Sequence, residues 1–153
     1  MPRKLARVAI GLVLAFAFAA VPAHAVNLDL RGGAYTGGDF DKPFAGVGFD
    51  SHLNGSLYFN PNVEYVFVDS GRFGTLNFDA IYALPFDGPP SLYVGAGLGL
   101  VHTDPEGSGG TETKPRANII FGIGFGSGRS SPYIQGKYIT GYKYWVVAAG
   151  FRF

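Results

Sequence analysis

The sequence predicts an all-β fold: an eight-stranded, antiparallel, up-and-down β-barrel that spans a membrane. Three observations lead to this prediction. Apolar and polar residues alternate with period two along most of the chain, which places them on opposite faces of strands. The 153 residues include 24 Gly, 14 Phe and 9 Tyr, and only 15% of the residues are charged. This composition is too aromatic for a disordered chain, and the length suits one domain.

The first 25 residues are predicted to be a signal peptide that is cleaved on export. Three basic residues precede an uncharged apolar run over 8–21, and Ala23-His24-Ala25 is a small-x-small cleavage site. The apolar run is shorter than the roughly 20 residues that a spanning helix needs. We therefore expect residues 26–153 to form the barrel domain. That part has nine Lys/Arg and eleven Asp/Glu residues, a balance that does not favour nucleic acid as a partner.

Eight segments with period-two alternation are predicted as strands. They are 26–36, 43–53, 57–68, 73–84, 91–102, 115–126, 132–140 and 143–153. The connectors between them contain Gly, Asn, Asp or Pro, the residues that a chain uses where it reverses direction. The longest expected connector is the run from Asp104 to Lys114. Eight strands of roughly 9 to 11 residues, the length that crosses a bilayer, fit into the remaining chain with short connectors.

The two faces of these strands distinguish a membrane barrel from a soluble barrel of the lipocalin kind. One face carries Phe, Tyr, Leu and Ile without any charge, and the other combines the charges with glycines such as Gly95, Gly97 and Gly122. The lumen of an eight-stranded barrel is narrow, so the face with the small residues belongs inside. Aromatic residues near strand ends, such as Tyr82 and Trp145, match the interfacial girdles of membrane barrels. The sequence therefore favours the membrane barrel.

Eight charged residues on the polar face are predicted to form a network inside the lumen. They are Asp29, Arg31, Asp50, Glu64, Asp79, Arg116, Lys137 and Arg152. The four acids and four bases cancel, and buried charges persist only when they are paired and hydrogen-bonded. The acids come from the first half of the barrel and most of the bases from the second, so the pairs must bridge its walls. We expect Glu64, Asp79 and Lys137 to form the centre of a network that plugs the lumen.

The last strand has apolar residues at alternate positions and ends on an aromatic residue. These positions are Trp145, Val147, Ala149, Phe151 and Phe153. The pattern resembles the C-terminal signal that the outer-membrane insertion machinery of Gram-negative bacteria reads. With the strand count and segments such as 92–100 and 131–137, the chain resembles the small eight-stranded outer-membrane β-barrel family grouped around the OmpA membrane domain, OmpX and OmpW.

This resemblance implies a protein of the bacterial outer membrane, exported through the periplasm, with its N-terminus on the periplasmic side. The implied partners are outer-membrane lipids, lipopolysaccharide and the insertion machinery, and the implied state is a monomer. We expect a role in membrane integrity, with no catalysis and no cofactor. The chief alternative is an OmpW-like conduit for small hydrophobic molecules. Inward apolar residues near the outer end favour that alternative, namely Tyr35, Phe44, Val101, Ile139, Tyr142 and Tyr144.

The remaining alternatives, an adhesin and a lipid A-modifying enzyme, have weaker support. His102 with Asp69-Ser70 is the best catalytic candidate, but alternation points His102 away from the lumen. Asp104, Glu106 and Glu112 lack the spacing of an oxygen-ligand loop for a metal. The chain has no Cys, which excludes disulfides, thiolate metal sites and a lipidated N-terminal Cys.

Overall fold

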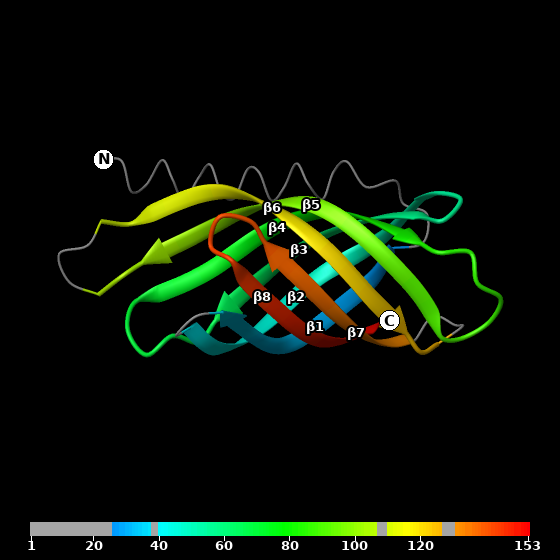
Figure 1. Cartoon of the computed structure of the whole chain (residues 1–153), viewed down its shortest axis with the longest axis horizontal. Coiled ribbons are helices and arrows are strands. Elements are labelled where there is room, and N and C mark those ends of the chain that lie inside the picture. The colour runs from blue at the N-terminus through cyan, green and yellow to red at the C-terminus, as the bar shows by residue number, and fades with distance from the viewer. Residues whose placement is uncertain (1–25, 38–39, 107–109, 127–130) are drawn as a thin grey trace.

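A computed structural model describes residues 26–37, 40–106, 110–126 and 131–153, which form a closed barrel of eight antiparallel strands (Figure 1). The strands are β1 (Val26–Gly37), β2 (Phe40–Asn54), β3 (Leu57–Val66), β4 (Arg72–Ala83), β5 (Ser91–Asp104), β6 (Glu112–Gly124), β7 (Ser131–Ile139) and β8 (Tyr144–Arg152). Each strand pairs with the next, and β8 closes the barrel on β1. The predicted all-β, up-and-down architecture is confirmed. The predicted signal peptide lies outside the described residues.

The described part of the chain contains no helix that is long and apolar enough to cross a membrane.

The predicted strand limits agree with the structure to within three residues, and the differences of three are at the starts of β2 and β6. Both strands beside the connector expected at 104–114 are longer than predicted. There β5 continues to Asp104 and β6 begins at Glu112, with Thr103 paired to Glu112 and His102 to Thr113. The prediction of a long loop was therefore wrong at both of its ends. Backbone pairing does not require apolar side chains, so the ladder extends beyond the alternating segment from which the strands were predicted.

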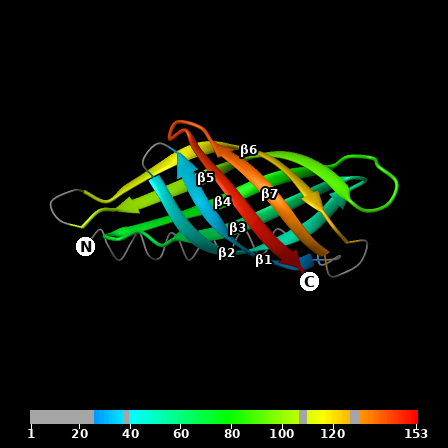
Figure 2. The same cartoon turned by 60° about the horizontal axis from the view of Figure 1, so that its bottom comes forward.

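The two ends of the barrel differ in shape. We call the end at which β1 begins and β8 ends the terminal end, and the end with the β1–β2, β3–β4, β5–β6 and β7–β8 connections the distal end. The distal rim is uneven, because β5 and β6 have 14 and 13 residues whereas β7 and β8 have 9 each. Figures 1 and 2 show the β7–β8 turn stopping well short of the β5–β6 hairpin. The rim is therefore lowest at the β7–β8 turn.

The outer surface of the barrel is apolar, as predicted. Leu98 is 65% exposed, Ile119 55% and Val147 53%, and none of the residues predicted for this face is buried. The predicted charges instead point inward: Asp29, Glu64, Asp79 and Lys137 are each at most 1% exposed. This arrangement is the reverse of a soluble barrel and is typical of a barrel surrounded by lipid.

The buried side chains inside the barrel form three layers. The distal apolar layer consists of Tyr35, Phe44, Val66, Phe73, Val101, Ile139, Val146 and Ala148. Next comes a central polar layer, described below. The terminal layer consists of Ile81, Tyr93, Ile120 and Tyr133. An eight-stranded barrel leaves little more than the room that these side chains occupy.

Candidate functional site

The central polar layer is built around an ion pair that crosses the lumen. Lys137 on β7 places its Nζ 2.7 Å from both Oε1 and Oε2 of Glu64 on β3, the strand on the opposite wall. Both side chains are buried. Glu64 also accepts hydrogen bonds from the hydroxyls of Tyr35 and Thr75, and Arg31 Nη1 lies 3.7 Å from its Oε1. Charged groups and hydroxyls therefore satisfy this carboxylate on several sides.

A second group of contacts surrounds Asp29 on β1. Arg31 forms an ion pair with Asp29 and donates a hydrogen bond to Asn60 Oδ1 at 2.7 Å. Tyr133, from β7, donates its hydroxyl to Asp29 Oδ1 at 2.6 Å. Asn60 also donates to Asp50 Oδ1 at 2.7 Å. These contacts connect β1, β2, β3 and β7 in one hydrogen-bonded group.

Asp79 is held by amides and not by the cation that we expected. Its carboxylate accepts hydrogen bonds from Asn62 Nδ2 at 3.0 Å and Asn118 Nδ2 at 3.1 Å. Asn118 also donates to Asn77. The expected contact between Asp79 and Lys137 is not formed, because Lys137 extends across the lumen to Glu64. Amide donors therefore satisfy Asp79 in the direct contacts that the structure describes.

Glycines make room for side-chain contacts between strands that are separated by one other strand. In one row, Asp79 on β4 is paired with Gly97 on β5, which is paired with Asn118 on β6. A Cβ on Gly97 would lie 2.1 Å from Asp79 Oδ1, so only glycine leaves space for the Asp79–Asn118 hydrogen bond. Gly46 on β2 likewise leaves space between Arg31 on β1 and Glu64 on β3, its paired residues on the two neighbouring strands. These glycines confirm the prediction that small residues make space inside the barrel.

At the terminal end, Arg152 lies in the lumen between an acid and two aromatic rings. Its Nε lies 2.5 Å from Asp50 Oδ2, and its guanidinium lies over the rings of Tyr133 and Tyr93, at 4.4 and 5.2 Å from their centroids. A cavity of about 320 Å³ opens beside this pair and is bordered by Asn27 and Ser91 among others. The ion pair and the two aromatic rings therefore separate this cavity from the central layer.

Arg116 stands apart from the other seven residues of the predicted network. It is half-buried near the distal end, where its guanidinium lies 4.7 Å from the centroid of the Tyr142 ring. No Asp or Glu among the described residues lies within ion-pair distance of it. Its position follows from the strand lengths, because β6 continues beyond the point where β7 ends at Ile139. The assignment of Arg116 to the lumen network therefore needs correction.

Several residues that hydrogen-bond within the central polar layer, some of them from the layers on either side, were not among the predicted charged residues. They are Tyr35, Asn60, Asn62, Thr75, Asn77, Asn118 and Tyr133. The asparagines lie on the predicted polar face, so the alternation locates them without indicating their bonds. Tyr133 shares its face with Gln135 and Lys137, and this parity was the available signal. It was missed because tyrosine occurs on both faces of this barrel, as the exposed Tyr82 and the buried Tyr35 show.

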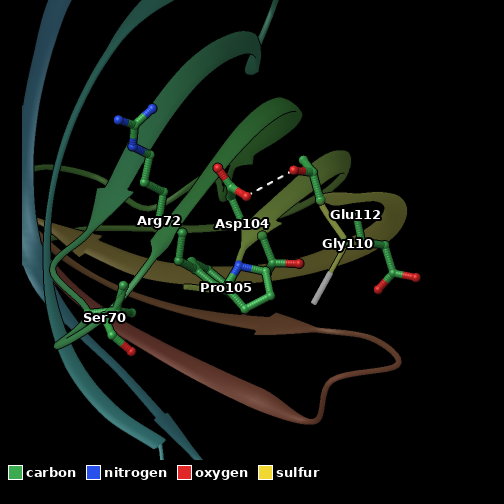
Figure 3. A pocket seen from close by; sticks show the side chains of 10 residues that line it. Ser70, Arg72, Asp104, Pro105, Gly110 and Glu112 are labelled. Carbon is green, nitrogen blue, oxygen red and sulfur yellow. Dashed lines mark hydrogen bonds between the residues drawn. The ribbon is translucent and has the colours of Figure 1, made fainter. Parts of the chain in front are cut away.

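A second cavity lies at the distal end, above the apolar layer. It has a volume of about 680 Å³, and Val68 and Phe73 border it on the side of that layer. Figure 3 shows Arg72 and Asp104 on neighbouring strands at its edge. The dashed line in the figure is the hydrogen bond that Thr111 donates to Asp104 Oδ1 at 2.9 Å. Both cavities described here therefore lie at the mouths of the barrel, on either side of the packed layers.

The structure does not bring together His102, Asp69 and Ser70, the best catalytic candidate from the sequence. His102 Nδ1 lies 2.9 Å from Thr113 Oγ1, whereas Asp69 forms an ion pair with Lys42. His102 thus contacts neither Asp69 nor Ser70. Within the described ranges, no three His, Asp or Glu side chains are grouped so that they could hold a metal ion.

The five residues of the predicted insertion signal all lie on the outer face of β8 or at its end. Trp145 is 47% exposed and Phe153 50%, and Val147, Ala149 and Phe151 are also exposed. The backbone N–H of Phe153 donates to Leu28 O at 2.9 Å, so the last residue is held against β1. The outward row is therefore continuous to the end of the chain.

Comparison with known proteins shows similarity in structure without similarity in sequence. No protein-family model and no curated protein sequence matches the chain. The N-terminal β-barrel domain of Pseudomonas aeruginosa OprF is similar with a TM-score of 0.64 at 19% identity, covering 84% of this chain and 96% of that one. Neisserial surface protein A gives 0.63 at 16% identity, covering 83% and 94%.

Ail, the attachment invasion locus protein of Yersinia pestis, gives a TM-score of 0.55 at 16% identity and covers 84% of this chain and 97% of its own. All three structures are small β-barrels that extend over most of the described chain. The protein therefore has the fold of the small eight-stranded outer-membrane β-barrels.

Proposed function

We propose that this protein is a sealed integral barrel of the bacterial outer membrane that contributes to membrane integrity and has no catalytic activity. The observation that supports this most strongly is the Lys137–Glu64 pair, which joins opposite walls at the centre of the lumen. Packed layers lie on both sides of it. The apolar outer surface suits a membrane location, and the predicted signal peptide and insertion signal suit the outer membrane.

Separating buried partners in a low-dielectric interior is costly, because each then lacks its counter-charge. Water and ions would have to displace the pair, the amide contacts of Asp79 and the two flanking layers in order to pass. We therefore expect the parent barrel to be closed to ions in its resting state.

The second candidate is the conduit for small hydrophobic molecules. The distal apolar layer favours it, since an apolar solute would find apolar walls there. Against it, eight side chains of that layer are themselves buried against one another, each no more than 6% exposed. Passage would require Tyr35, Phe44 or Phe73 to move.

Planar-bilayer recordings and cell fractionation test the proposal together. The protein should be recovered in the outer membrane, change its gel mobility on boiling and give no steady conductance. Lys137→Met should produce frequent openings, whereas Lys114→Met, which removes an exposed ion pair with Glu112, should not. Steady conductance by the parent, or uptake of hydrophobic solutes into vesicles, would favour the conduit.

A further inference from the structure

The described part of the chain contains three Lys or Arg residues that form no ion pair, and all three lie at the distal end. Arg31, Lys42, Lys114, Lys137 and Arg152 each pair with an acid. Arg72, Arg116 and Lys143 do not. Two of these three, Arg116 and Lys143, lie together at the lowest part of the distal rim. Arg116 packs over the β7–β8 turn, and Lys143 belongs to that turn.

Arg116 is held in place by its surroundings although no acid among the described residues pairs with it. Its guanidinium lies over the Tyr142 ring, which stacks on Tyr144 at 5.4 Å between centroids. A Cβ on Gly141 would lie 3.1 Å from Arg116 Cζ, so the guanidinium packs directly on the turn. Among the described residues, its buried Nε has no hydrogen-bond partner, and Nη1 makes only a long bond of 3.4 Å to Pro115 O. The guanidinium is thus positioned, and its Nη groups have donors to spare for a ligand.

The height of this site relative to the membrane follows from the neighbouring aromatic residues. Tyr138 and Trp145 are cross-strand partners on the outer face, with ring centroids 5.0 Å apart. Tyr and Trp gather at membrane–water interfaces. Lys143 is exposed and lies two residues beyond Trp145, so the turn stands at the level of the lipid headgroups. Elsewhere the rim is higher, because β5 and β6 extend beyond it (Figure 2).

The free edge of β6 beside this low rim does not suit a strand from another protein. Its residues Glu112–Arg116 pair with β5 but extend beyond the end of β7. Pro115 has no N–H to offer, and Lys114 and Arg116 place charges on either side of it. Prolines and charges on an edge oppose strand addition. An anionic headgroup is the occupant that suits unpaired cations at this height, since guanidinium binds phosphate through paired hydrogen bonds.

We propose that Arg116 and Lys143 form a binding site for the phosphate of an outer-leaflet glycolipid of the lipopolysaccharide type, with Lys114 adding positive charge nearby. The headgroup lies over the low β7–β8 turn, beside the projecting β6 edge. Arg116 donates to the phosphate oxygens, and Lys143 approaches from the turn. This inference rests on the proposed outer-membrane location, because the glycolipid is found there.

The site is tested by measuring lipid A binding. The protein is first extracted from cell membranes in an uncharged detergent. Trp145 is the only Trp of the chain and lies two residues from Lys143, so its fluorescence reports the event. The probes are bisphosphorylated lipid A and the same lipid without phosphates. We expect the parent to bind the phosphorylated form about tenfold more tightly, and Arg116→Gln to bind the two forms equally.

Arg72→Gln is the matched control, because Arg72 is also distal and unpaired but lies on β4, away from the turn. It should bind as the parent does. Lys143→Gln, at an exposed position, should weaken the preference for phosphorylated lipid A. The gel shift on boiling reports whether each variant folds. If Arg116→Gln does not fold, Lys143→Gln still tests the site. Equal binding of the two lipids by the parent, or an unchanged preference in Arg116→Gln, would overturn the site.

Inorganic phosphate separates a lipid site from a general anion site. Phosphate at about 10 mM should leave lipid A binding largely unchanged, because the acyl chains add affinity that the free ion lacks. Complete competition at that concentration would overturn the assignment to a lipid. If lipid A does not bind at this site, the parent should still show no steady conductance, so the proposal of a sealed barrel would be unaffected. Steady conductance with phosphate-dependent binding would instead contradict the sealed barrel and leave the site standing.

Discussion

Lys137 and Glu64 lie 73 residues apart in the chain and form the central contact of the lumen, with Nζ 2.7 Å from each carboxylate oxygen. Replacing Lys137 by Met leaves the Glu64 carboxylate buried beside Tyr35 and Thr75. We expect a loss of about 3 to 5 kcal/mol in the free energy of unfolding, measured by urea titration in lipid vesicles. The double variant Lys137→Met with Glu64→Gln should recover part of this loss. Lys114→Met should cost less than about 1 kcal/mol.

Tyr133 and Tyr93 provide a matched comparison of two hydroxyls in the terminal layer. Tyr133 donates to the charged Asp29 at 2.6 Å, whereas Tyr93 makes a longer bond of 3.3 Å to the neutral Gln135. Tyr133→Phe should therefore lower stability by about 1.5 to 3 kcal/mol and Tyr93→Phe by about 0.5 to 1.5 kcal/mol. The same urea titration measures both. A larger effect at Tyr93 would mean that the contacts of Asp29 are assigned wrongly.

A substitution at Gly97 tests whether the contact between Asp79 on β4 and Asn118 on β6 requires a glycine between them on β5. An added methyl group would lie 2.1 Å from Asp79 Oδ1 and 2.5 Å from the carbonyl oxygen of Phe78. Because the second contact is with backbone, Gly97→Ala should cost about 1 to 3 kcal/mol through overpacking. Gly32→Ala is the control, since its nearest contact would be an ordinary 3.4 Å. Similar stability of the two variants would argue against a crowded central layer.

The lipid-facing surface predicts a cost for charge that depends on depth. Phe121 and Ala80 are exposed on the outer face, and arginine at either position should cost about 2 to 4 kcal/mol near the bilayer midplane. Asp87→Arg, in the β4–β5 connection, should be close to neutral. Gly71 is unsuitable as a control, because its φ of +79° and a 2.4 Å approach to Asp104 O would add strain of their own. Equal losses at all three positions would mean that the outer face is misassigned.

The terminal aromatic residue predicts an effect on assembly. Phe153 is 50% exposed, and its N–H donates to Leu28 O where β8 closes on β1. Deleting it removes the last outward position of the predicted insertion signal, so less folded barrel should reach the outer membrane, as judged by the unboiled gel band. Phe86→Ala, at a 59% exposed position in a connection, should leave the yield unchanged. An undiminished yield without Phe153 would exclude its role as a signal.

Local alternation in the sequence was enough to determine the number of strands, their approximate limits and the face on which each side chain lies. Side chains along a strand point alternately to its two faces, so Phe121 and Lys137 could be assigned to opposite faces without knowledge of strand pairing. The glycines could likewise be assigned to the lumen, because a narrow barrel needs small residues there.

Only the tertiary structure decided which inward residues meet. A contact across the lumen depends on how far each strand is shifted along its neighbour, and every such shift moves the side chains up or down the barrel. This register brings Lys137 within ion-pair distance of Glu64 and places Asp79 within hydrogen-bond distance of Asn62 and Asn118. It also places Arg116 beyond the end of β7, over the turn at Gly141. Alternation gives the face of Arg116 but not its height, and the height separates it from the buried acids.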